Sequence, residues 1–146
     1  MTIRIIAATA TATALAIGTS ALAEEAKAPV SDAGTAFMQR CLADVTASRI
    51  ALIKKQAPDF AASLSDDDLT AGARQKAVRA CPCFLHIIGV SPVSEGDTPE
   101  EKVANIVAYL TALTTDETVT MPLVLSTVTK NCGERSSVLP PSWYGQ

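Results

Sequence analysis

The sequence has few aromatic residues, little charge and a single histidine. Aromatic side chains make up 4% and charged side chains 18% of the 146 residues, whereas 48% are hydrophobic. This apolar content is too high, and the net charge of −3 too small, for a disordered chain. The acidic balance also argues against nucleic-acid binding, which requires a basic surface. Length and composition together predict one small folded domain.

The chain also lacks a recognisable catalytic or cofactor-binding motif. None of its serines stands in the Gly-x-Ser-x-Gly setting of a hydrolase nucleophile. The aspartates at 66–68 lack the spaced oxygen ligands and central glycine of a calcium loop, so we expect them at the start of a helix. Glu100 and Glu101 also fall in a first helical turn rather than in a catalytic pair. We therefore predict a non-enzymatic protein with no catalytic residues, no cofactor and no resident metal.

The first 23 residues have the three-part order of a secretory signal peptide. Arg4 gives a positive start, residues 5–17 form an apolar run, and residues 21–23 (Ala-Leu-Ala) have the small side chains of a cleavage site. The apolar run is shorter than the ~20 residues that span a bilayer. We expect cleavage after Ala23 and no stable membrane insertion afterwards. The alanine-rich leader is typical of bacteria and predicts a periplasmic protein.

Apolar spacing and capping residues predict an all-α fold of four to five short helices over residues 24–135. The expected helix starts are, in chain order, Ser31 or Asp32, Ser65, Thr98 and Asp116. The first helix is expected to end near Gln56 and the last near Cys132. Residues 136–146 form a separate proline-containing tail with Trp143 and Tyr144. These two aromatic residues either bind a partner or lie in a tail that is mobile or folded back on the domain.

The segment Cys81-Pro82-Cys83 is expected to interrupt the helix that begins at Ser65. Proline lacks a backbone N–H and disfavours a helical conformation in the residue before it. We predict a kink or a break at Pro82. A new short helix would then run from Cys83 to about Ile88, and Gly89 would end it.

All four cysteines lie beyond the predicted signal peptide, and thiols in an oxidising compartment tend to pair. Residues two apart on a helix point in nearly opposite directions, so Cys81 and Cys83 reach different neighbours. We predict two long-range disulfides that join these two residues to Cys41 and Cys132. The spacing does not decide whether Cys81 or Cys83 pairs with Cys41.

Three other hypotheses for these cysteines stay open. A Cys81–Cys83 bridge would be strained and oxidising, and Cys-Pro-Cys is similar to the redox motif of the mitochondrial intermembrane-space disulfide carrier. Cys81, Cys83 and His86 could instead hold a copper ion, with help from Met38 or Met121. A free thiolate with His86 as its base would be a catalytic nucleophile.

The order of motifs resembles that of known exported proteins. The chain carries Phe-Met-Gln-Arg-Cys at 37–41, Cys-Pro-Cys-Phe-Leu at 81–85, Thr-Pro-Glu-Glu at 98–101 and Asn-Cys at 131–132. This layout resembles that of small all-helical bacterial proteins with a Cys…Cys-x-Cys…Cys order. Residues 83–90, the Thr98 helix up to Tyr109-Leu110 and Cys132 also resemble the Tai-type immunity proteins of type VI secretion. That group usually has a cysteine before its threonine-led helix, which is missing here, and the Cys-Pro-Cys is additional.

The resemblance implies a helical, disulfide-bonded periplasmic protein. For the Tai-type group it implies the neutralisation of a cell-wall-degrading effector. Together with the absence of catalytic motifs, it predicts a binding or accessory protein that engages another protein. The alternative is a thiol-redox or copper-handling protein that uses Cys81, Cys83 and His86.

Overall fold

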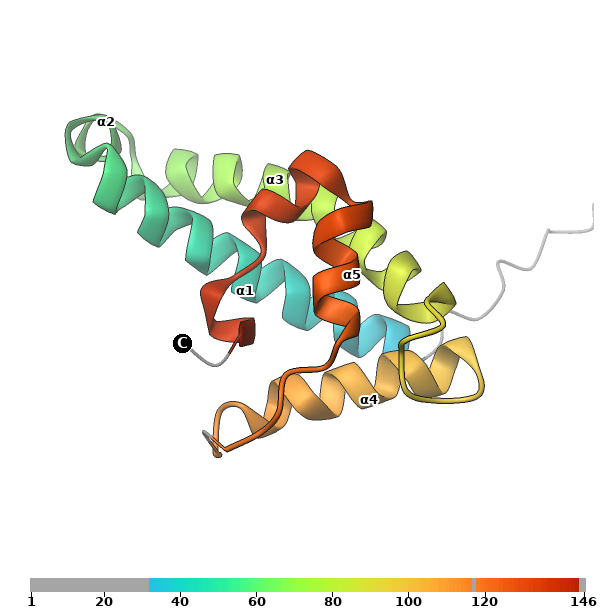
Figure 1. The fold of residues 1–146 in the computed structure, drawn as a ribbon. Helices are drawn as coiled ribbons and strands as arrows, with labels where there is room; N and C mark the ends of the chain where they lie inside the picture. Colours follow the sequence, from blue (N-terminus) through green and yellow to red (C-terminus); the bar gives the residue numbers. More distant parts are fainter. Residues whose placement is uncertain (1–31, 117, 145–146) are drawn as a thin grey trace, which may run out of the picture.

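The computed structural model describes residues 32–116 and 118–144, and within these ranges the chain is all-helical, as predicted. Figure 1 shows the arrangement. The elements are α1 (Asp32–Gln56), α2 (Pro58–Ser63), α3 (Asp66–Val90), α4 (Pro99–Ala112), α5 (Val124–Asn131) and the 3₁₀ helices η1 (Gly133–Val138) and η2 (Pro141–Tyr144). The predicted signal peptide lies outside the described residues.

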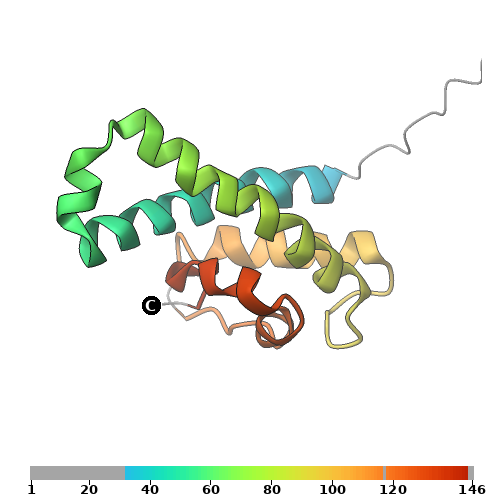
Figure 2. The same cartoon turned by 90° about the horizontal axis from the view of Figure 1, so that it is seen from above.

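The two longest helices, α1 and α3, form an antiparallel hairpin with α2 at its turn. Helix α4 packs against both of them, and α5 packs against α3 (Figures 1 and 2). The end of the hairpin that carries α2 projects beyond α4 and α5 (Figure 2). The core therefore lies where α1, α3, α4 and α5 meet, and the projecting end is mostly exposed.

Two predicted helix starts are confirmed by their capping bonds. The Ser65 hydroxyl accepts a hydrogen bond from the backbone N–H of Asp68 at 3.1 Å, which caps α3. At α4, Thr98 and Glu101 form a reciprocal capping box. The Glu101 carboxylate accepts the backbone N–H groups of Asp97 at 2.9 Å and Thr98 at 3.1 Å, and these bonds lower the pKa of Glu101.

The predicted break at Pro82 is wrong, because α3 continues through it to Val90. A separate helix over 83–88 does not form, and the end expected at Gly89 falls one residue later. Proline removes one backbone donor inside a helix, but the residues around it bury apolar surface on both sides of that position. Ala80, Cys81 and Phe84 are all fully or almost fully buried. Packing and cross-linking of these neighbours outweigh the lost hydrogen bond.

Because Pro82 lies inside the continuous helix α3, we predict that it destabilises this helix. Because the proline is exposed, Pro82→Ala would remove no core contact and would supply an N–H for the carbonyl of Val78. We expect the free energy of unfolding to rise by about 1–3 kcal/mol. Urea unfolding of the oxidised protein measures it, with the exposed Gln75→Ala on the same helix as a control that stays within about 0.5 kcal/mol. A lower stability for Pro82→Ala would contradict the prediction.

The predicted start of the last helix at Asp116 is also wrong. Helix α5 begins at Val124, eight residues later, and no side chain caps it. Asp116 instead accepts hydrogen bonds from the backbone N–H of Thr118 at 2.8 Å and from its hydroxyl at 2.6 Å, which closes a local turn. The end of the helix is as predicted, with Cys132 as the C-cap and Gly133 at a φ of 53°.

Candidate functional site

The four cysteines form two disulfides, as predicted, and the structure decides their pairing. Cys41 on α1 is bonded to Cys81, and Cys83 is bonded to Cys132 at the end of α5. The Cα atoms are 5.9 Å apart in the first bridge and 6.1 Å apart in the second. Since Cys81 and Cys83 stand two residues apart on one continuous helix, they face opposite neighbours. Helix α3 is therefore linked to α1 on one side and to α5 on the other.

The two disulfides disfavour the three other hypotheses for the cysteines. Cys81 and Cys83 are not bonded to each other, and the described part of the chain has no free cysteine to serve as a thiolate. His86 is exposed on α3, and no group of three or more potential metal ligands occurs among the described residues. Cys81, Cys83 and His86 thus lie within two turns of one helix but do not form a ligand set, because both sulfurs are in disulfides.

The C-terminal aromatic residues lie against the helices rather than in an exposed tail. Trp143 is only 1% exposed, and its ring meets those of Phe37 and Phe84 edge to face, at centroid distances of 5.9 and 6.4 Å. Its indole N–H donates to the Asp44 carboxylate at 2.8 Å. Trp143 therefore cannot serve as an exposed partner-binding residue in this conformation. Tyr144 is half-buried, and its hydroxyl lies 3.3 Å from that of Thr129.

A second hydrogen bond holds the same segment in place. The Tyr109 hydroxyl donates to the backbone carbonyl of Trp143 at 2.7 Å, and burial raises the pKa of Tyr109. Asp44 in turn accepts from the guanidinium of Arg40 at 2.6 Å. Every buried side-chain nitrogen or oxygen among the described residues has a hydrogen-bond partner. These polar groups are thus explained by packing, and none of them is left unpartnered in a cavity.

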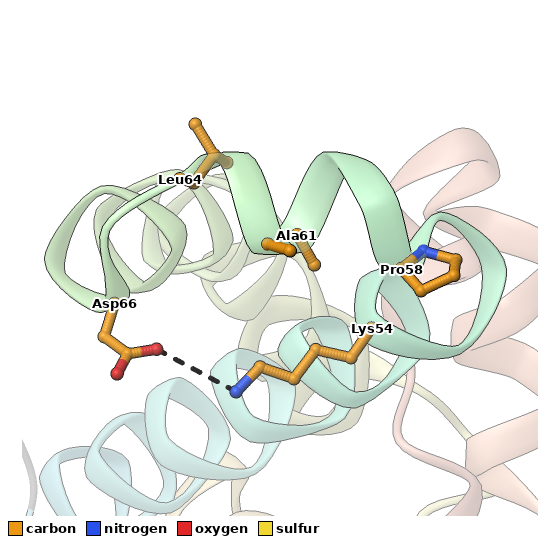
Figure 3. Close-up of a pocket in the computed structure, with 6 residues that line it drawn as sticks. Lys54, Pro58, Ala61, Leu64 and Asp66 are labelled. Carbon is orange, nitrogen blue, oxygen red and sulfur yellow. Dashed lines mark ion pairs between the residues drawn. The ribbon is translucent and has the colours of Figure 1, made fainter.

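One surface hollow lies at the projecting end of the α1–α3 hairpin (Figure 3). Its lining is mostly small and apolar, and its charged residues are Lys54 and Asp66. Their nitrogen and oxygen atoms are 3.9 Å apart, with 57% and 97% of the side chains exposed. An ion pair this exposed contributes little stability. We do not assign a function to this hollow.

A larger hollow, of about 540 Å³, lies between α1, α3 and η1 and has a different chemical character. We call it the basic hollow. Its lining includes four cationic side chains, one carboxylate, one hydroxyl and two apolar residues: Arg49, Lys76, Arg79, Arg135, Glu134, Ser137, Ala80 and Val138. The described residues form two ion pairs, and neither involves any of these four cations. An acidic chain thus collects one third of its 12 lysines and arginines around one hollow.

The Cys83–Cys132 disulfide helps to shape the basic hollow. Lys76, Arg79 and Cys83 recur at helical spacing, so they lie along the same side of α3. Cys132 directly precedes η1, which carries Arg135. The bridge therefore holds η1 beside the face of α3 that carries two of the cations.

Sequence reasoning missed the basic hollow. Lys76 and Arg79 fit the pattern of a helix with basic residues near its C-terminal end, and Arg49 and Arg135 have no unusual sequence neighbours. Arg49 and Arg135 are 86 positions apart in the sequence, and no local pattern brings them together. The one available signal was the expected disulfide between Cys132 and either Cys81 or Cys83 in the C-terminal half of α3.

No helix in the described ranges is both long and apolar enough to cross a membrane. Disulfides are typical of proteins in oxidising compartments outside the cytoplasm, and this chain has two. No family model, no curated protein and no solved structure matches the chain.

Proposed function

We propose that this protein is exported to the periplasm, where it acts as a non-enzymatic binding protein that engages another protein through the basic hollow. The observation that carries the proposal is the set of four cations around one hollow of an acidic chain, none of which forms an ion pair with another described residue. Clustered charge of one sign steers a partner of the opposite sign and favours its correct orientation. The periplasmic location rests on the predicted signal peptide together with the two disulfides.

The disulfide-linked frame suits such a role. The hollow is lined by residues of α1, α3 and η1, and the two bridges link α3 to α1 and to the residue before η1. A binding surface held in one conformation loses less entropy when a partner binds. The same bridges occupy all four cysteine sulfurs, which supports a binding role over thiol or copper chemistry.

Affinity capture with the exported, tagged protein tests this proposal. The bait is compared with Arg79→Glu/Arg135→Glu, which reverses two charges in the hollow, and with Lys55→Glu/Arg74→Glu, which makes the same charge change outside it. We expect an exported protein to be captured by the wild type and the outside variant and to be lost from the hollow variant. Equal capture by all three baits, or no capture by the wild type, would refute the proposal.

The resemblance to Tai-type immunity proteins supports a narrower form of this proposal, in which the partner is a cell-wall-degrading enzyme. In that case the captured protein would be a secreted hydrolase. Its activity on purified cell wall would fall when the wild-type protein is added and would persist with the hollow variant. A captured partner without hydrolase activity would exclude the immunity role and leave the binding role intact.

A further inference from the structure

We infer that the basic hollow recognises an acidic peptide segment, in which two or more carboxylates are spaced along an extended chain. The inference rests on the proposed function and deepens it, because it states which part of a partner protein the hollow would bind. The alternatives are a compact inorganic anion and an anionic membrane surface. Four features of the hollow favour the peptide over a compact anion, and the binding of anionic vesicles tests the membrane alternative.

The first feature is the type of cation. Three of the four positive side chains are arginines, at positions 49, 79 and 135. The planar guanidinium fork matches a carboxylate or a phosphate with two parallel hydrogen bonds. The hollow therefore offers several separate forks, and a ligand with several separate acidic groups would use them best.

The second feature is the absence of a backbone cradle on the α1 and α3 walls. Phosphate sites commonly use free backbone N–H groups at helix N-termini or in glycine-rich turns. Here Arg49 lies well inside α1, and Lys76 and Arg79 lie well inside α3. Backbone N–H groups in helix interiors are already bonded to carbonyls four residues earlier. These walls thus bind through side chains alone, which suits carboxylates carried by a flexible chain.

The third feature is the carboxylate of Glu134 in the lining. A compact dianion in the middle of the hollow would be repelled by this group. An extended peptide can place its own carboxylates on the arginines and turn a backbone N–H toward Glu134, which accepts hydrogen bonds. Glu134 would then discriminate against free anions.

The fourth feature is size and lining. A volume of about 540 Å³ falls in the range of sites that hold drug-sized ligands and is far more than one phosphate needs. Ala80 and Val138 supply apolar surface between the cations. The methylene groups of glutamate side chains can pack against such surface while their carboxylates reach the arginines.

The experiment measures the binding of three probes to the full oxidised protein by calorimetry: a short acetylated peptide of alternating Glu and Gly, inorganic phosphate, and vesicles containing an anionic phospholipid. We expect the peptide to bind and its affinity to fall as salt is raised. The peptide with Gln in place of Glu should not bind. Phosphate at the same concentration should neither bind comparably nor displace the peptide.

Variants locate the peptide in the hollow. Arg79→Glu is expected to weaken peptide binding by about tenfold to a hundredfold, the range for loss of a charge-assisted contact. Arg74→Glu makes the same change on the same helix outside the hollow and should leave the affinity within about twofold. Glu134→Gln should raise the affinity for phosphate, because the repelling carboxylate is gone, whereas a loss of folding would lower the binding of both probes. Unchanged phosphate binding by this variant would contradict the role given to Glu134.

The outcomes separate this inference from the proposed function. Binding of phosphate or of anionic vesicles in preference to the peptide would overturn the inference, as would equal effects of Arg79→Glu and Arg74→Glu. If the peptide fails to bind but the captured partner is still lost from the hollow variant, the inference falls and the binding function stands. If the peptide binds in the hollow and no partner is captured, the inference stands and the proposed function falls.

Discussion

Replacing Cys41 and Cys81 by alanine is expected to lower the free energy of unfolding by about 4 kcal/mol, given a sequence separation of 40 residues between them. The bridge restricts the unfolded chain, and its loss restores that entropy. Both residues are also fully buried, so the truncation removes packing from the centre of the core. The free energy of unfolding of a domain this size is about 5–15 kcal/mol, and the variant would be marginally stable.

Urea unfolding of the oxidised protein, followed by circular dichroism, measures the change. The matched control is Cys83→Ala/Cys132→Ala, which opens a loop of similar length, with a separation of 49 residues, but removes a less buried pair. We expect a smaller loss for this control, together with weaker binding at the basic hollow. A Cys41→Ala/Cys81→Ala protein with unchanged stability would show that the bridge does not stabilise the fold.

Truncation of Trp143 is expected to have an effect of similar size. Trp143→Ala should lower the free energy of unfolding by about 3–5 kcal/mol, as for other large buried aromatic residues. The change removes ring contacts with Phe37 and Phe84 and leaves Asp44 without the indole N–H. It also loosens the segment whose carbonyl accepts from Tyr109.

Two further variants make this prediction specific. Trp143→Phe keeps an aromatic ring and loses only the indole N–H and some volume, so its loss should be smaller. Phe60→Ala truncates an aromatic residue that is 57% exposed on α2, and it should change stability by less than about 0.5 kcal/mol. If Trp143→Ala were as stable as Phe60→Ala, the tail would not be packed on the domain in solution.

Local sequence signals predicted those features of the fold that depend on neighbours in the chain. The caps at Ser65 and Thr98 and the end of α5 beside Gly133 are each set by residues within one helical turn. The even number of cysteines, with Cys81 and Cys83 two positions apart, likewise predicted two bridges to different helices. These features depend on hydrogen bonds between near neighbours and on the directions in which a helical backbone points its side chains.

The failed predictions arose where packing or a competing local interaction outweighed a local preference. Pro82 is unfavourable inside a helix, but α3 continues through it because the residues next to it are buried and cross-linked. Asp116 has the chemistry of a helix cap, but it closes a turn with Thr118, and α5 begins only at Val124. At Pro82 a local preference of about 3 kcal/mol competes with the burial of several apolar side chains. At Asp116 one local interaction, the turn closed with Thr118, replaces another.

By itself the sequence determined the all-helical class, most of the helix boundaries and the commitment of its cysteines to cross-links. Only the tertiary structure decided that Cys41 pairs with Cys81, that Trp143 is buried, and that Arg49 and Arg135 share one hollow. The physical reason is the distance along the chain over which each kind of interaction acts. Helical periodicity and capping act over a few residues, whereas burial and charge clustering depend on which distant segments meet when the chain folds.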